Sequence, residues 1–216
     1  MVAIGFHEIY QFASPVPLKM PKQFEVYSAD HLPARGDTAK PQYSSHHANP
    51  VESWQTLDLS ASGMRAKRPQ PGAQLRRGQL LGVGFNALQQ GSGFALAEVR
   101  WLQQFTDDDA GGIAAGVRFV SSNAQVALVR VVGLDPGQYQ TVGPAFVLND
   151  GSGLDQLVLP SGWYAPARRV DLWFKKRLSA VQLTDLRTRG ADYEIAGYRP
   201  ASPESPSNSG VRRKSA

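Results

Sequence analysis

Residues 94–103 are Phe-Ala-Leu-Ala-Glu-Val-Arg-Trp-Leu-Gln, and this stretch decides the fold class. Side chains of a β-strand point alternately to its two faces. The alternation predicts one face with Ala95, Ala97, Val99 and Trp101 and an opposite face with Leu96, Glu98, Arg100 and Leu102. The same period returns along residues 113–119, where Ile113, Ala115, Val117 and Phe119 alternate with smaller or charged residues. Consecutive short strands of this kind, joined by glycine-bearing turns, favour a meander that closes into a small barrel.

The composition of the whole chain agrees with a β-rich fold. Among 216 residues, 42% are hydrophobic and only 19% are charged, and there are 21 glycines and 15 prolines. That hydrophobic content is sufficient for a buried core, and so many glycines and prolines leave little room for long helices. We therefore predict a mainly β protein, with a small antiparallel β-barrel followed by a β-rich C-terminal extension.

Changes in composition divide the chain into four segments. Residues 1–50 are Pro-rich, and Phe6, Ile9, Tyr10 and Phe12 suit one short amphipathic helix that docks on the rest. Residues 51–135 are expected to form the barrel, and residues 136–200 a β-rich extension docked on it. Residues 201–216, which include Arg212-Arg213-Lys214, are rich in Ser and Pro and are expected to be a disordered basic tail.

Several classes of function are disfavoured by what the sequence contains. The chain has no cysteine, which excludes disulfides, thiolate metal sites and a cysteine nucleophile. We find no Ser/His/Asp triad, phosphate-binding loop or paired-carboxylate motif, so we expect no enzyme, no cofactor and no metal site. Residues 78–97 form the longest uncharged run, but its Gln and Asn residues make it too polar to span a membrane. A cytoplasmic location is expected, since no basic and apolar signal segment opens the chain.

Residues 57–63, Leu-Asp-Leu-Ser-Ala-Ser-Gly, carry the strongest chemical signal. The pattern is Asp58-x-Ser60-x-x-Gly63, in which a carboxylate can accept from a guanine N1–H and amino group, and a hydroxyl can donate and accept. We expect Gly63 to adopt a positive φ and to let a ligand approach the backbone closely. The alternative is an ordinary Asx or Ser turn with a structural glycine.

The order of this motif and the later strands resembles the PilZ domain. The resemblance rests on Asp58, Ser60 and Gly63, then residues 98–101 (Glu-Val-Arg-Trp) and 116–119 (Gly-Val-Arg-Phe). PilZ domains are small β-barrels that in many bacteria bind the second messenger cyclic di-GMP. The resemblance therefore implies a PilZ-like β-barrel and cyclic di-GMP as the ligand of Asp58, Ser60 and Gly63.

The family also uses two upstream arginines spaced Arg-x-x-x-Arg to hold phosphates. Here Arg35, the only arginine before Asp58, is the candidate for this role, and Lys40 follows it five positions later. Residues 65–77 hold five basic residues, of which Arg65 and Arg68 are candidate phosphate ligands. The alternative for this stretch is a solvated basic loop. Nucleic acid is a poorer ligand, because no aromatic residues are interleaved with these cations to stack on bases.

The net charge of +5 suits an anionic ligand, although a soluble surface with excess arginine would give the same value. Two functions stay open at this point. One is a non-catalytic PilZ receptor or adaptor that binds cyclic di-GMP and signals through an unknown protein partner. The other is a degenerate PilZ domain that binds no nucleotide and serves as a protein-interaction module.

Overall fold

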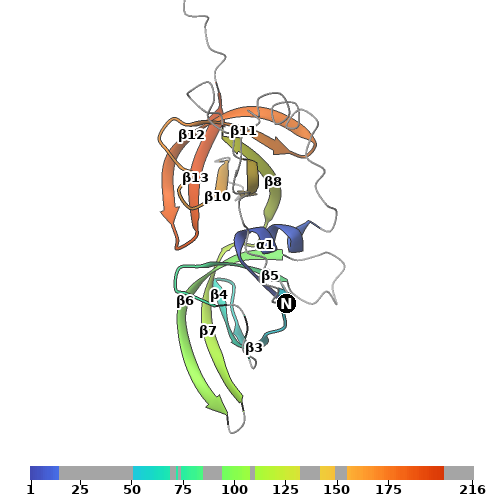
Figure 1. Cartoon of the computed structure of the whole chain (residues 1–216), viewed down its shortest axis with the longest axis vertical. Coiled ribbons are helices and arrows are strands. Elements are labelled where there is room, and N and C mark those ends of the chain that lie inside the picture. Colours follow the sequence, from blue (N-terminus) through green and yellow to red (C-terminus); the bar gives the residue numbers. More distant parts are fainter. Residues whose placement is uncertain are drawn as a thin grey trace, which may run out of the picture.

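The structure is a computed structural model that describes residues 1–14, 51–68, 72, 74–84, 94–107, 110–131, 142–148 and 155–201. The described residues are mainly β, as predicted, with one short helix. Their strands form a curled seven-stranded sheet and a closed six-stranded barrel (Figure 1). Most of the expected Pro-rich segment, residues 15–50, and the expected tail from residue 202 lie outside the described residues.

The seven-stranded sheet is antiparallel throughout and holds the motif residues. Its strand order is β2 (Val51–Glu52), β1 (Val2–Ile4), β5 (Leu80–Gly84), β6 (Phe94–Asp107), β7 (Ala110–Ser121), β4 (Gly63–Arg68) and β3 (Gln55–Leu59). One face buries a core to which Val2, Leu81, Val99 and Val117 contribute. The basic stretch at residues 65–77, for which a solvated loop was the alternative, is strand up to Arg68. The reason is that Met64, Ala66 and Arg68 are buried while Arg65 is exposed, which is a strand period.

The closed barrel uses the C-terminal strands. Its order is β10 (Gln156–Pro160), β13 (Tyr193–Pro200), β12 (Arg177–Arg189), β11 (Arg169–Phe174), β8 (Ala124–Val131) and β9 (Val142–Leu148). Strand β8 falls within the 51–135 range expected for the first barrel, but it pairs with β9 and β11 of this closed barrel. The chain therefore passes from one sheet to the other at residues 122–123, between β7 and β8.

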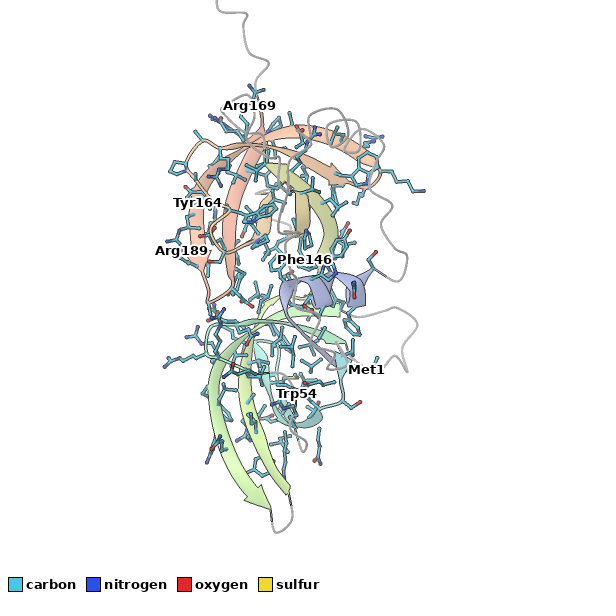
Figure 2. All side chains as sticks on the ribbon, viewed as in Figure 1. Met1, Trp54, Phe146, Tyr164, Arg169 and Arg189 are labelled. Atoms are coloured by element: carbon cyan, nitrogen blue, oxygen red, sulfur yellow. The ribbon has the colours of Figure 1, made fainter. Side chains whose placement is uncertain are left out.

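The helix α1 (Phe6–Ala13) lies between the two sheets (Figure 1). It corresponds to the short amphipathic helix expected near residues 6–12. Ile9 and Tyr10 of the helix share one hydrophobic cluster with Leu80 and Leu96 of the sheet and with Phe146 of the barrel. Phe146 lies where the barrel meets the helix (Figure 2), with its ring centroid 5.2 Å from that of Phe6 and 6.2 Å from that of Phe94. The two sheets are therefore packed on each other through a shared core.

Polar contacts join the same two sheets at the β12–β13 turn. The backbone N–H of Leu80 donates to Oδ1 of Asp192 at 2.9 Å, and the N–H of Ala191 donates to the carbonyl of Gly78 at 2.7 Å. Arg76 also donates to the carbonyl of Ala191 at 3.1 Å. The turn before β5 is thus hydrogen-bonded to the tip of a barrel hairpin.

Candidate ligand-binding site

The motif lies in the hairpin that joins β3 to β4. The backbone N–H of Ser60 donates to the carbonyl of Gly63 at 2.9 Å, and its hydroxyl donates to the same oxygen at 3.1 Å. Ser60 therefore closes the turn with both of its donors, and the oxygen of its side chain keeps lone pairs with which to accept a further hydrogen bond.

Gly63 is needed for a different reason from the one expected. Among the described glycines, a positive φ occurs at Gly5, Gly78 and Gly162 and not at Gly63. A Cβ at residue 63 would instead lie 2.1 Å from the carbonyl oxygen of Val117 on β7. The expectation of a left-handed backbone was therefore wrong, because the close approach of β4 to β7 is what excludes a side chain here.

The sheet register places the motif beside the later strand signatures. Asp58 pairs with Arg65, Arg65 with Gly116, and Gly116 with Trp101, so these four residues form one row across β3, β4, β7 and β6. The next row on the same face runs from Gly63 through Arg118 to Glu98. Residues from four strands thus share a single face of the sheet.

A β-bulge decides where Trp101 points. Val99 pairs with Val117 and Trp101 with Gly116, so three consecutive residues of β6 oppose two of β7, and Arg100 is the extra one. The bulge shifts the alternation by one position, and Leu102 joins Val99 in the core of the sheet. Trp101 lies on the opposite face, where it is 40% exposed. The predicted placement of Trp101 on the same face as Val99 was therefore wrong.

A cavity of about 330 Å³ lies on this face. It is lined by Asp58, Ser60, Ser62, Gly63, Met64, Arg65, Arg100, Trp101, Gly116, Val117 and Arg118. Gly116 lets the indole of Trp101 lie against the sheet, because a Cβ at residue 116 would be 2.0 Å from Nε1 of Trp101. The result is a hollow with an aromatic wall, one carboxylate and three guanidinium groups.

The three arginines of the hollow differ in the exposure of the carboxylates with which they pair. Arg65 lies 3.4 Å from Asp58, and both side chains are 60% exposed. Arg100 and Arg118 each form an ion pair with Glu98, at 3.1 and 2.9 Å, and about half of each arginine side chain is exposed. Exposed ion pairs contribute little to stability. An anionic ligand can therefore recruit Arg65 at small cost, whereas Arg100 and Arg118 stay paired with Glu98, whose side chain is only 11% exposed.

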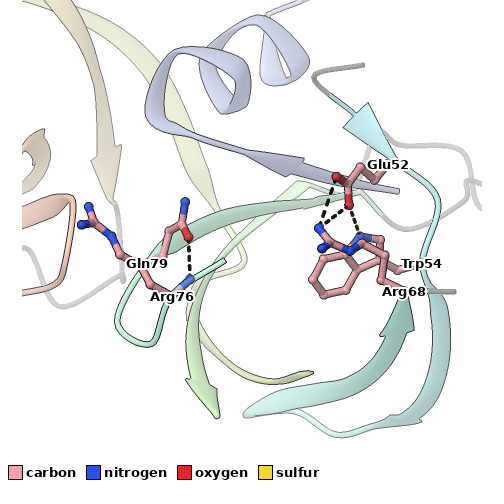
Figure 3. A network of polar contacts seen from close by, with 5 residues as sticks. All are labelled: Glu52, Trp54, Arg68, Arg76 and Gln79. Carbon is pink, nitrogen blue, oxygen red and sulfur yellow. Dashed lines mark hydrogen bonds and ion pairs between the residues drawn. The ribbon is translucent and has the colours of Figure 1, made fainter. Parts of the chain in front are cut away.

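The structure brings together four of the six residues predicted to bind ligand. Asp58, Ser60, Gly63 and Arg65 line the cavity. Arg68 lies elsewhere, since its buried side chain forms an ion pair with Glu52 at 3.3 Å (Figure 3). Arg35 lies outside the described residues.

Among the cavity residues that sequence reasoning missed are two arginines and the tryptophan, namely Arg100, Trp101 and Arg118. All three belong to the strand signatures at residues 98–101 and 116–119 that supported the family resemblance. The signal was present, but it was used to identify the fold and not to extend the site.

A larger cavity of about 570 Å³ lies in the closed barrel, lined mainly by β11, β12 and β13. Its lining includes Leu172, Phe174 and Tyr198 and none of the motif residues. Volume therefore favours this cavity, but the converging polar groups favour the smaller one, which we take as the candidate site.

Comparison with known families gives a match whose range covers these strands. The PilZ domain family matches residues 36–134. The chain carries a PilZ domain. PilZ domains belong to a family of cyclic di-GMP-binding receptors and adaptors and are generally non-catalytic. No curated protein and no solved structure matches the chain.

The matched range includes every strand of the candidate site, from β3 to β7. It also covers β8, so the PilZ match extends into the first strand of the closed barrel. Among the described helices, none has the length and apolar character needed to cross a membrane.

Proposed function

We propose that this PilZ domain binds cyclic di-GMP on the face formed by β3, β4, β7 and β6. One observation carries the proposal: the register of four strands gathers Asp58, three arginines and Trp101 around a single hollow. Each of these groups matches one chemical part of a cyclic dinucleotide, which has two guanine edges, two base planes and two phosphates.

Asp58 supplies the contact to a guanine edge. Its carboxylate is exposed at the end of β3 and can accept from the ring N1–H and the amino group together. Arg65, which now lies beside it, is free to turn toward a phosphate. The exchange replaces one exposed ion pair with two charge-assisted interactions, which are the stronger kind.

Arg100 and Arg118 are proposed to take the role of the upstream arginines. The family uses two upstream arginines to hold phosphates, whereas here Arg35 is the only arginine before Asp58. Guanidinium groups present a planar fork that fits phosphate in a bidentate manner. The half-exposed indole of Trp101, fixed by its contact with Gly116, offers a flat surface on which a base can stack.

Calorimetric titration with cyclic di-GMP tests the proposal. The full chain is expected to bind, and Asp58→Asn is expected to weaken binding about tenfold or more, because the guanine edge loses a charged acceptor. Asp185→Asn is a matched control, since Asp185 is 59% exposed and also forms an exposed ion pair, with Arg187 on β12. Equal affinities for the wild type and Asp58→Asn would disprove the assigned site.

A second candidate is a protein-interaction module that no longer binds nucleotide. It is favoured by strand β3, which lies at one end of the sheet order and exposes Leu57 by 52% and Leu59 by 54%. A wild-type protein that binds no cyclic di-GMP would support this alternative. Under either function we propose a cytoplasmic protein that acts through a protein partner and without catalysis.

A further inference from the structure

Glu98 connects the candidate site to the closed barrel. Its Oε1 accepts from Arg100 at 3.1 Å, and its Oε2 accepts from Arg118 at 2.9 Å. The same Oε2 also accepts from the hydroxyl of Tyr193 at 3.2 Å. Glu98 is itself 8% exposed and does not line the cavity. It therefore acts on the hollow only through the two arginines that it holds.

Tyr193 belongs to the other sheet. It is the first residue of β13 in the closed barrel and has no exposed surface. Burial, with the nearby charge of Glu98, raises the pKa of its phenol above the usual value, so the hydroxyl keeps its proton and remains a donor. The barrel thus supplies a fixed donor to the carboxylate that holds Arg118.

We propose that Tyr193 is a positioning residue of the nucleotide site, acting through Glu98 on Arg118 and Arg100. The inference rests on the proposed function, since it concerns the same hollow. With Tyr193 in place, Oε2 of Glu98 is held by a buried donor, and the guanidinium of Arg118 is held over the hollow in turn. Without that donor the carboxylate gains freedom, and ordering Arg118 on a phosphate costs more conformational entropy.

The arrangement also couples the two sheets. A phosphate bound to Arg118 shares this guanidinium with Glu98, which changes how strongly Oε2 of Glu98 accepts from the hydroxyl of Tyr193. Coupling between two contacts is reciprocal, so a change at Tyr193 that alters ligand affinity implies that the ligand alters the Tyr193 contact. Ligand binding would thereby change a contact of the closed barrel, whose outer surface could then transmit the signal to a partner.

The test compares two tyrosine variants of the full chain by titration with cyclic di-GMP. Tyr193→Phe removes the donor to Glu98 and is expected to weaken binding about threefold to tenfold, the range of one moderate hydrogen bond. Tyr164→Phe is the matched control, because Tyr164 belongs to the same barrel (Figure 2) and its hydroxyl donates to the carbonyl of Thr184 at 3.0 Å instead of to Glu98. Its affinity is expected to equal that of the wild type.

A second background separates positioning from a general structural effect. Arg118 is half-exposed, so Arg118→Ala should leave the fold intact. If Tyr193 acts through Arg118, then Tyr193→Phe should weaken binding clearly less in the Arg118→Ala background than in the wild type. An undiminished effect in that background would overturn the inference.

Two other outcomes of the titration separate a failure of this inference from a failure of the proposed function. A wild type that binds cyclic di-GMP while Tyr193→Phe and Tyr164→Phe bind equally well would overturn this inference and leave the proposed function standing. A wild type that does not bind at all would overturn both.

Discussion

Glu52 and Arg68 form a buried ion pair of 3.3 Å although their strands lie far apart in the order of the seven-stranded sheet. Glu52 is on β2, which is one end of the order, and Arg68 is on β4, next to the other end. Trp54, in the link between β2 and β3, donates from Nε1 to Oε2 of Glu52 at 2.8 Å (Figure 3). The sheet is therefore curled until its two ends approach each other. In the part of the chain that the structure describes, side-chain contacts, and not backbone hydrogen bonds, join these ends.

Removing the ion pair between Glu52 and Arg68 should destabilise the sheet. Glu52→Ala leaves the buried guanidinium of Arg68 without its carboxylate, and we expect a loss of about 3 kcal/mol in the free energy of unfolding. Urea denaturation of the full chain measures it. Asp185→Ala, which removes an exposed carboxylate, is the control and should shift the midpoint little. A similarly small shift of the midpoint for Glu52→Ala would show that this ion pair does not stabilise the sheet.

Gly116→Ala should damage the site through Trp101. The new Cβ would lie 2.0 Å from Nε1 of Trp101, so the indole must leave its place against the sheet. We expect affinity for cyclic di-GMP to fall about tenfold, the loss of one base-stacking contact. Gly143→Ala is the control, since its Cβ would similarly press on Trp163 in the closed barrel, at 2.7 Å from Cη2. Equal affinities for the two alanine variants would show that Trp101 does not contact the ligand.

Phe146→Ala should lower the stability of both sheets together. Phe146 has no exposed surface and packs against Phe6 of α1 and Phe94 of β6. Loss of a buried phenylalanine costs about 3–5 kcal/mol. We expect the full chain to unfold in one calorimetric transition, and the variant to unfold in one transition at a lower temperature. Two separate transitions, with only one of them displaced, would contradict a shared core.

Asp192 should make the junction of the two sheets sensitive to pH. Burial raises the pKa of its carboxyl above the ordinary 3.8, an effect that the hydrogen bond from Leu80 only partly opposes. The folded state therefore binds the proton more tightly than the unfolded chain, and this residue's contribution to stability falls as the pH rises from 3.8 through the raised pKa.

Asp192→Asn tests the direction of this pH dependence. The amide oxygen of the asparagine can still accept from Leu80, while the side chain carries no charge. Relative to the wild type, the variant should gain stability as the pH rises through that window and keep the gain at neutral pH. Urea denaturation at several pH values between about 3 and 7 measures the difference. A difference that is constant over this range would contradict the raised pKa.

Much of the fold and part of the site follow from local patterns in the sequence. The two-residue period of residues 94–103 and 113–119 was sufficient to predict β6 and β7, and the short amphipathic pattern was sufficient for α1. Asp58, Ser60, Gly63 and Arg65 could be predicted to lie together because they are neighbours along one hairpin. Such predictions succeed because strand alternation and turn chemistry depend on residues only a few positions apart.

Tertiary structure alone decided the rest. The bulge at Arg100 depends on how β6 pairs with β7, and it turns Trp101 from the core toward the cavity. Arg68 has a structural role because the curled sheet brings it to Glu52. Glu98 connects the candidate site to the closed barrel because the barrel places Tyr193 against it. Each of these outcomes is set by hydrogen bonds and packing between residues at least fifteen positions apart in the chain, which no local period encodes.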